Sequence, residues 1–383
     1  MGFMNSTAAR VAGALLATLI VAGGAQAQNK GKGGKGPVVV SPEVKADRTV
    51  VFRIYAPKAE AATVSSSDIP ANYKPRTMMK GENGVWEVTL GPVDPGTYRY
   101  VFSVDGVTTA DSKNPATSES NSTAWSVVHV PGADFMDTTS VPHGAVARVY
   151  YPSSVLGRTR RLHVYTPPGY ETGAEKYPVF YLLHGAGDSD DSWTSVGRAN
   201  FILDNLIAAK KARPMIVVMP AGHTGPFGAG GKGGGFGAAK FEEEFQKDIM
   251  PYVEKHYRTL SDRPHRAIAG LSMGGAQTLA AAIAQPKDFG FVGVFSSGLI
   301  FGKAADSEKA IQGGLADPET RKGLKLLWFA TGSDDFLVAR TRETVDLFKK
   351  NGTNPVYRET SGGHTWINWQ LYLNEFAPQL FRE

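Results

Sequence analysis

The sequence contains no cysteine among its 383 residues. This absence excludes a disulfide framework, and it also excludes a lipid anchor attached to a cysteine. The fold therefore has to be stabilised by apolar burial and hydrogen bonds, without covalent cross-links. A chain of this length is sufficient for two domains that each have a core of their own.

The sequence also lacks an apolar run near its start that is long enough to cross a bilayer. The run at residues 11–24 has about 14 residues, whereas a membrane-spanning helix needs roughly 20. Arg10 is the only charge before it, and residues 25–27 (Ala-Gln-Ala) have the form of a signal-peptidase site. We therefore expect residues 1–27 to be a signal peptide cleaved before Gln28. The mature bacterial protein would then be secreted or periplasmic, with no membrane partner after cleavage.

Positive charge is not concentrated in the part of the chain that is expected to fold. The net formal charge is +5, but Arg10 and three lysines of the glycine-rich leader at residues 28–40 account for four of these charges. A nearly neutral remainder does not favour a nucleic-acid partner. Glycine-rich residues 222–237 lack the spacing of a P-loop, and no His, Asp and Glu residues have metal-ligand spacing, so we expect no cofactor and no metal. The glycine-rich segment is either a lid over the site or a surface excursion.

The first folded segment, residues 41–131, has strand patterning and no helical periodicity. Alternating runs separated by Pro and Gly turns occupy residues 49–55, 85–90, 97–104 and 126–130. This pattern predicts a small all-β sandwich. We expect Trp86 to fill its core, although the same ring type can bind sugars. The polar loop at residues 108–123 is expected to reach across to the border of the catalytic cleft.

After a linker at residues 132–144, the segment 145–383 alternates strands with helices. Strands are expected to begin near residues 147, 162, 179, 215, 267, 291, 326 and 356, and helices are expected at 201–211, 241–257, 275–284 and 336–350. The alternation predicts an α/β fold, with a mostly parallel sheet covered by helices on both faces. Functional loops would gather at the carboxyl ends of the strands.

The pentapeptide at residues 270–274, Gly-Leu-Ser-Met-Gly, carries the strongest chemical signal. An apolar strand-like run leads into it, and an alanine-rich helical segment follows it. The G-x-S-x-G pattern in this context predicts a nucleophile elbow, a sharp turn that exposes the hydroxyl of Ser272. The alternative is a glycine-rich turn with a structural serine.

A serine nucleophile needs a base and an acid, and both follow in the order that the elbow arrangement uses. The apolar run at 326–330 predicts a buried strand, with Asp334 and Asp335 on the loop beyond its end. A strand at 356–360 leads to His364, which we predict to be the base. Either aspartate could meet the imidazole. We predict that Asp335 does so and that Asp334 caps the following helix.

The developing oxyanion needs backbone donors. One predicted donor is the amide of Met273, directly after the nucleophile. The apolar run at 178–183 predicts a buried strand that ends in His-Gly-Ala-Gly. The amide of Ala186 is the second predicted donor, with Gly187 as the alternative, and His184 is expected to brace this loop.

Together these motifs resemble carbohydrate esterase family 1, the group of feruloyl and acetylxylan esterases related to esterase D and the enterochelin esterases. The matching segments are residues 182–185 (Leu-Leu-His-Gly) followed by Trp193, 270–275 (Gly-Leu-Ser-Met-Gly-Gly), Gly332 with Asp335, and 362–366 (Gly-Gly-His-Thr-Trp). The resemblance covers roughly residues 145–381. It implies an α/β-hydrolase fold with serine esterase chemistry, and it supports Asp335 as the acid.

The N-terminal segment resembles the immunoglobulin-like early-set domains grouped as family-48 carbohydrate-binding modules. The resemblance rests on residues 52–57, 84–86, 95–100 and 104–106. Such modules accompany family-1 esterases and are also found in starch-acting enzymes. The resemblance therefore implies a carbohydrate context.

Substrate contacts are predicted from aromatic residues in segments that should face Ser272. The candidates are Trp193, Phe227, Trp366 and Trp369, with Phe236 as a further wall of the pocket. The acids at positions 188, 190 and 191 are expected to form a solvated turn. The sequence thus predicts a secreted serine esterase acting on ester-substituted plant cell-wall polysaccharide or oligosaccharide, with feruloyl esters of arabinoxylan as the first candidate. Acetylxylan esterase, siderophore esterase, acyltransferase and non-catalytic carbohydrate-binding protein are the alternatives.

Overall fold

The computed structural model describes residues 36–69, 74–225, 238–300, 309, 311, 314 and 318–382. The chain divides into two units, Met1–Gly36 and Pro37–Glu383, and everything below concerns the second. The expected signal peptide and most of the leader lie outside the described residues, as do Phe227 and Phe236. Within the described ranges, no helix has the length and apolar character needed to cross a membrane.

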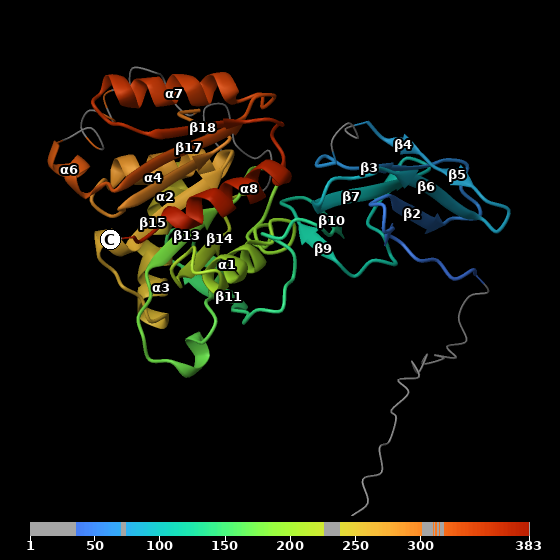
Figure 1. The fold of residues 1–383 in the computed structure, drawn as a ribbon, viewed down its shortest axis with the longest axis horizontal. Coiled ribbons are helices and arrows are strands. Elements are labelled where there is room, and N and C mark those ends of the chain that lie inside the picture. Colours follow the sequence, from blue (N-terminus) through green and yellow to red (C-terminus); the bar gives the residue numbers. More distant parts are fainter. Residues whose placement is uncertain are drawn as a thin grey trace, which may run out of the picture. The chain divides into compact units, whose positions relative to one another are not determined.

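The N-terminal part of the described chain is a sandwich of two antiparallel sheets (Figure 1). One sheet has the order β1-β2-β6-β5, and the other has the order β4-β3-β7-β10-β9, with β8 paired to β7. The strands are β1 (Glu43–Val44), β2 (Val50–Tyr55), β3 (Ala62–Ser65), β4 (Arg76–Thr77), β5 (Met79–Lys80), β6 (Val85–Leu90), β7 (Gly96–Val104), β8 (Val107–Thr109), β9 (Thr117–Glu119) and β10 (Ala124–Val130). The four predicted strands correspond to β2, β6, β7 and β10.

Alternating side chains of the two sheets build the core of the sandwich. Phe52 on β2 and Tyr100 on β7 are fully buried, and their ring centroids are 4.7 Å apart. Trp86 is buried in the same cluster, and its indole Nε1 donates a hydrogen bond to the carbonyl of Ala56 at 3.0 Å. The prediction that Trp86 fills the core is confirmed.

The C-terminal part contains one eight-stranded sheet in the order β11-β12-β14-β13-β15-β16-β17-β18. The strands are β11 (Ala145–Ser153), β12 (Arg158–Thr166), β13 (Val179–Leu183), β14 (Ile216–Pro220), β15 (Arg266–Leu271), β16 (Phe291–Phe295), β17 (Leu326–Gly332) and β18 (Val356–Thr360). The pairs formed by β11 with β12 and by β12 with β14 are antiparallel, and the pairs from β14 through β18 are parallel. All eight predicted strands are present.

The described helices are α1 (Ala199–Ala208), α2 (Ala238–Glu244), α3 (Met250–His256), α4 (Met273–Ala284), α6 (Pro318–Gly323), α7 (Val338–Lys350) and α8 (Trp366–Phe376), with 3-10 turns at Tyr170–Thr172, Arg263–His265 and Ala377–Gln379. The helix predicted at residues 241–257 is interrupted by a π-helical turn at Phe245–Ile249. Pro251 lies in the first turn of α3 and has no N–H to donate to the preceding turn. A local change in the hydrogen-bond ladder accommodates this missing donor.

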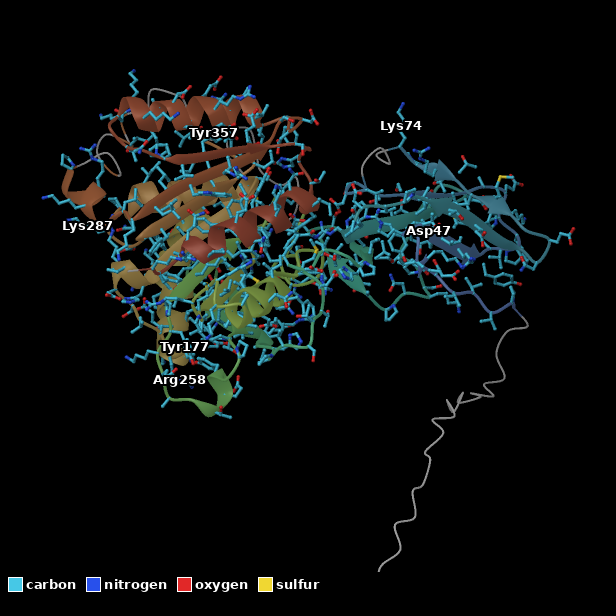
Figure 2. All side chains as sticks on the ribbon, viewed as in Figure 1. Asp47, Lys74, Tyr177, Arg258, Lys287 and Tyr357 are labelled. Atoms are coloured by element: carbon cyan, nitrogen blue, oxygen red, sulfur yellow. The ribbon has the colours of Figure 1, made fainter. Side chains whose placement is uncertain are left out.

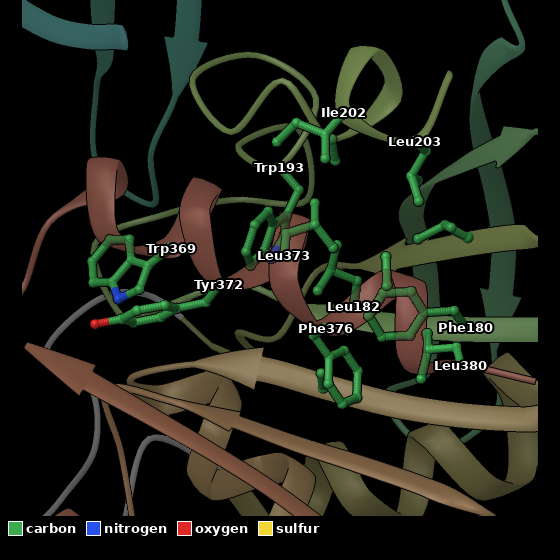
Figure 3. Packing of buried hydrophobic residues seen from close by; sticks show 14 of the residues in the cluster. Phe180, Leu182, Trp193, Ile202, Leu203, Trp369, Tyr372, Leu373, Phe376 and Leu380 are labelled. Atoms are coloured by element: carbon green, nitrogen blue, oxygen red, sulfur yellow. The ribbon is translucent and has the colours of Figure 1, made fainter. Parts of the chain in front are cut away.

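Helices cover both faces of the sheet, as the alternation of strands and helices predicts. All five residues of β13 are buried because the strand lies between two apolar layers. Phe180 and Leu182 face the cluster that α1 and α8 complete (Figure 3), whereas Val179, Tyr181 and Leu183 face the cluster of α2, α3, α4 and α7. This double burial holds the carboxyl ends of the parallel strands in place, and the loops that leave these ends form one edge of the sheet.

Strand β7 of the sandwich contacts α8, the last α-helix of the C-terminal part. A Cβ atom built on Gly96 would lie 2.5 Å from Cδ1 of Ile367, so the absence of a side chain at Gly96 permits this close approach. Ile367 itself packs against the sandwich core. The Gln370 amide donates hydrogen bonds to the carbonyls of Thr97 at 3.3 Å and Val196 at 2.7 Å. These contacts place β7 beside α8.

Many side chains on the outside of the described chain end in nitrogen or oxygen atoms (Figure 2). Arg342 pairs with Glu359, and Tyr357 donates its hydroxyl to the same carboxylate at 2.6 Å. Arg358 pairs with Glu375 at 3.1 Å. Exposed pairs of this kind contribute little to stability, so the site is positioned mainly by the buried layers.

Candidate active site

Ser272 lies on a sharp turn between β15 and α4. Its backbone has φ 51° and ψ −117°, a conformation that L-residues rarely adopt. The two flanking glycines permit the turn, since a Cβ atom on Gly274 would lie 2.5 Å from the carbonyl oxygen of His184 and one on Gly270 would lie 2.4 Å from the backbone of Gly274. The sharp turn predicted between the strand and the helix at Ser272 is therefore the observed local structure.

Neighbouring strands fix this strained turn. The amide of Ser272 donates to the carbonyl of Phe295 at 2.9 Å, and Ser297 Oγ donates to the carbonyl of Ser272 at 2.6 Å. Ser297 follows the carboxyl end of β16, the strand next to β15. Strain of this kind persists only where the surroundings over-determine the conformation, and it is found mostly at functional sites.

His364 and Asp335 meet at the same edge of the sheet. Nδ1 of His364 lies 3.0 Å from both carboxylate oxygens of Asp335. The two residues come from the loops after β18 and β17, which pair in parallel, with Gly332 opposite Thr360. Burial alone would raise the pKa of Asp335, but hydrogen bonding and attraction to His364, with the Leu337 amide, outweigh it and hold this pKa below its usual value. Asp335 is therefore an ionised, buried partner for the imidazole.

Asp334 lies next in the chain but has a different environment. Its side chain is exposed, whereas that of Asp335 is buried. The prediction that Asp334 caps the following helix is wrong, because Asp335 Oδ1 accepts the Leu337 amide at 2.8 Å just before α7. A single buried carboxylate thus holds both the imidazole and the helix entry.

Two aromatic rings flank the imidazole of His364. The Trp369 ring is perpendicular to it, with centroids 5.0 Å apart, and Trp369 Nε1 donates to Ser296 Oγ at 2.9 Å. The Phe336 ring lies 4.4 Å away and is 75% exposed. A pocket of about 720 Å³ beside His364 is lined by Asp334, Phe336, Thr360, Ser361, Gly362, Gly363, Thr365, Ile367, Asn368 and Leu371. Phe336 was not among the predicted site residues; an apolar residue directly after the predicted acid was the available signal.

The loop after β13 lies beside Ser272. A Cβ atom on Gly185 would be 3.5 Å from Cβ of Ser272. The amide of Asp188 donates a hydrogen bond to the carbonyl of Gly185 at 3.2 Å, which closes a tight turn. The amides of Ala186 and Gly187 inside this turn have no acceptor among the described residues, and Met273 begins α4, where backbone amides lack helical partners. Met273 directly follows Ser272, and Ala186 and Gly187 lie in the turn that begins beside Ser272; their role as oxyanion donors stays a prediction.

His184 braces this loop, as predicted. Its Nδ1 donates to the carbonyl of Gly185 at 2.8 Å, and its Nε2 accepts the amide of Gly222 at 2.8 Å. Burial lowers the pKa of His184, so the ring stays neutral with the proton on Nδ1. Both nitrogens are occupied, and this histidine is not available as a base.

The prediction that the acids after this loop form a solvated turn is wrong. Asp188, Asp190 and Asp191 are all buried. Asp190 binds Arg161 and His163, and Asp188 binds Arg99 of the sandwich at 2.6 Å. These partners lie far away in the sequence, so local polarity gave no sign of them.

The predicted substrate role of two tryptophans is also corrected. Trp193 and Trp366 are each 1% exposed, and their rings meet edge to face at 5.1 Å. Trp193 Nε1 donates to the Leu183 carbonyl at 3.1 Å. These rings therefore belong to the core behind the loops. Trp369 is buried too but borders His364, and Phe227 lies outside the described residues.

The polar loop of the sandwich contacts the C-terminal segment, and its expected place at the border of the cleft stays a prediction. Glu119 on β9 accepts from Arg161 and donates its amide to both Asp191 oxygens at 3.1 Å. Ser118 Oγ accepts from Ser195 Oγ at 2.8 Å. Sequence reasoning did not identify Arg99 or Asp68, which complete this contact from inside the sandwich.

Asp68 is a buried carboxylate between the two domains. Its oxygens face the amides of Trp366 and Arg99, each at 3.4 Å. Burial raises its pKa to about 6, since the attraction of Arg99 and the two amides only partly offsets desolvation and Asp188 adds repulsion. The folded state therefore binds this proton more tightly than the unfolded chain does.

This shift predicts a pH-dependent stability. Between about pH 4 and pH 6 Asp68 is protonated to a greater extent in the folded protein than in the unfolded chain. The contribution of Asp68 to the free energy of unfolding therefore falls as pH rises. Asp68→Asn should therefore gain stability relative to the unchanged protein across that window, by up to about 3 kcal/mol. Urea unfolding of both proteins at pH 4, 5, 6 and 7 measures the difference. A difference that stays constant with pH would contradict the raised pKa.

No group of three or more His, Asp or Glu side chains in the described ranges is placed to hold a metal ion. Ser272, His364 and Asp335 follow the carboxyl ends of β15, β18 and β17, and therefore lie at one edge of the sheet together with the backbone amides of the loop after β13. This set matches the requirements of acyl transfer through a serine.

The strand order and the serine turn between β15 and α4 define an α/β-hydrolase. The model of the Esterase family matches residues 153–380, and the chain belongs to this family. Residues 39–121 match carbohydrate-binding module 48, described as the isoamylase N-terminal domain. These matches confirm the predicted fold class and the predicted family resemblances.

Similarity to one relative extends over both parts of the chain. The endo-1,4-beta-xylanase/feruloyl esterase of Xylanibacter ruminicola is 32% identical over 356 residues, covering 89% of this chain and 46% of that protein. The chain thus spans less than half of that relative. A CE1 ferulic acid esterase structure from Anaeromyces mucronatus is 25% identical with a TM-score of 0.57, covering 66% of this chain and 96% of its own.

A third likeness concerns the fold alone. The enterobactin esterase structure from Shigella flexneri is 18% identical, with a TM-score of 0.63, and covers 87% of this chain and 92% of its own. It extends over more of this chain than the ferulic acid esterase does.

Proposed function

We propose that the protein is a serine esterase that works through an acyl-enzyme formed on Ser272. The observation that carries this proposal is the contact between His364 Nδ1 and the buried carboxylate of Asp335, at the edge of the sheet where Ser272 occupies its strained turn. An imidazole held in this way keeps its Nδ1 proton on the carboxylate side. Its Nε2 is then the nitrogen that can accept a proton from a serine hydroxyl.

In the proposed reaction, Ser272 Oγ attacks the ester carbonyl while His364 Nε2 takes the hydroxyl proton. The carbonyl oxygen becomes an oxyanion, which the amides of Met273 and Ala186 or Gly187 stabilise. His364 then gives its proton to the departing alcohol, and the acyl group stays on Ser272. A water molecule, deprotonated by the same imidazole, releases the acid and restores the serine.

The proposed substrate is an ester-substituted plant polysaccharide, with feruloyl esters of arabinoxylan as the first candidate. Three observations support it. The relatives named above include a xylanase/feruloyl esterase and a ferulic acid esterase, and the N-terminal segment matches a carbohydrate-binding module. The exposed Phe336 ring beside His364 offers apolar surface that a phenolic acyl group or a sugar face would cover. We further propose that the enzyme is secreted or periplasmic, on the basis of the signal-peptide pattern in residues 1–27.

A hydrolysis panel tests the substrate. We expect a higher kcat/KM for methyl ferulate or methyl p-coumarate than for an acetyl ester of matched leaving group, by about 10-fold to 100-fold, because burying an aromatic ring in the transition state contributes roughly 1.5–3 kcal/mol. Phe336→Ala should reduce this preference, and Tyr357→Phe on β18 serves as a surface control. Rapid release of acetate from acetylated xylan without release of ferulate would overturn the feruloyl proposal and leave the serine mechanism intact.

A further inference from the structure

Arg99 lies on β7 of the sandwich, yet its guanidinium contacts the catalytic domain. Nη1 donates to Asp188 Oδ1 at 2.6 Å, and Nη2 donates to Ser192 Oγ at 2.8 Å. Within the sandwich, Ser118 Oγ accepts from both Nε and Nη2, at 3.1 Å and 2.8 Å. Arg99 is 5% exposed and Asp188 is equally buried. A buried charge pair with satisfied partners keeps one geometry, because separating it leaves an uncompensated charge.

Asp188 links this ion pair to the proposed oxyanion turn. Its Oδ2 accepts the amide of Gly185 at 3.1 Å, and its own amide donates to the Gly185 carbonyl. The turn closed by these two bonds carries the amides of Ala186 and Gly187. Asp188 therefore holds the Gly185–Asp188 turn through its own hydrogen bonds. Arg99 in turn holds the carboxylate of Asp188.

The same guanidinium also reaches the loop that carries the base. Its Cζ lies 5.3 Å from the centroid of the Trp366 ring, a cation–π contact two residues after His364. The Trp366 ring meets Trp369 edge to face at 5.2 Å, and Trp369 meets the imidazole at 5.0 Å. Arg99 is thus connected to the Gly185–Asp188 turn through Asp188, and to His364 through Trp366 and Trp369.

We propose that Arg99 is a positioning residue of the esterase site, so that the N-terminal sandwich is part of the catalytic machinery and not only a tether to polysaccharide. The proposal rests on the function proposed above. Oxyanion donors stabilise the transition state only when they are held within a fraction of an ångström of the developing charge. Arg99 consequently acts on kcat, and it acts equally on small and polymeric esters.

The test replaces Arg99 with methionine, which keeps an apolar stem and removes the guanidinium. On 4-nitrophenyl acetate we expect kcat to fall about 10-fold to 100-fold, with KM changed by less than about 3-fold. The inhibition constant of a boronic acid that forms a tetrahedral adduct on Ser272 should rise in proportion to the loss of kcat. Arg99→Lys keeps the charge without the forked geometry of the guanidinium. This variant should recover part of the lost kcat and part of the lost inhibitor affinity.

Glu119→Gln is the matched control. Its carboxylate crosses the same interface to Arg161 and Arg148 but does not touch the Gly185–Asp188 turn, so kcat should stay within about 2-fold. Because Arg99→Met leaves Asp188 buried without its partner and can prevent folding, Arg99→Met with Asp188→Asn is the second variant. We expect this double variant to fold and to have a kcat at least about 10-fold below that of the unchanged protein, since the contact from the Arg99 guanidinium is missing.

Four results would overturn the proposal. The first is an unchanged kcat in a folded Arg99→Met protein or in the double variant. The second is a loss of kcat that is confined to polymeric substrate, and the third is a change in KM with kcat unchanged. The fourth is an equal loss of kcat in Glu119→Gln. Ser272→Ala is measured in parallel. Retained activity in that variant would refute the acyl-enzyme itself, and the two failures are therefore distinguishable.

Discussion

Replacing Ser272 with alanine is expected to lower kcat by about 10³-fold or more while the protein keeps its fold. The reason is that the hydroxyl is the only group at the elbow that can form an acyl-enzyme, whereas the turn itself is held by Phe295 and Ser297 through backbone atoms of Ser272. His364→Ala should lower kcat by a similar factor. The double variant should lose little more than either single variant, because nucleophile and base act as a unit.

The measurement is kcat on methyl ferulate and 4-nitrophenyl acetate, with circular dichroism to verify folding. Ser154→Ala, in the turn between β11 and β12, is the control for a serine-to-alanine change and should retain full activity. A folded Ser272→Ala protein that retained a tenth of the activity would refute Ser272 as the nucleophile.

Asp335→Asn is expected to have the second-largest effect, a loss of about 10³-fold in kcat, whereas Asp334→Asn should change kcat by less than about 3-fold. The asparagine side chain can still accept the Leu337 amide and keep the entry to α7. It cannot stabilise an imidazolium, and its NH₂ group favours the wrong tautomer of His364. Asp334 is adjacent in sequence but exposed, so it is the matched control.

The comparison of the two variants is made at saturating substrate, where kcat is separated from binding. An equal loss in both variants would indicate a general electrostatic effect of the loop. A larger loss in Asp334→Asn would move the acid to Asp334 and would require the loop to rearrange during catalysis.

Local sequence determined the parts of this protein that depend on neighbouring residues. Alternating polarity predicts the sandwich strands, and short apolar runs between helices predict the eight strands of the sheet. The G-x-S-x-G pattern predicts the turn at Ser272, since a Cβ atom added at Gly270 or Gly274 would lie only 2.4–2.5 Å from neighbouring backbone atoms. Catalytic candidates could be found because loops at the carboxyl ends of parallel strands share one edge.

Tertiary structure alone decided which side chains meet across the domains and which are buried. Three acids that look like a solvated turn are buried because each meets a partner that is distant in sequence: Asp188 pairs with Arg99, Asp190 pairs with Arg161, and Asp191 accepts the amide of Glu119. Trp193 and Trp366 carry no local mark that separates a core ring from a binding surface. Asp334 and Asp335 differ only in orientation after a strand. In each case the outcome depends on a partner that is distant in sequence, and local patterning carries no information about such a partner.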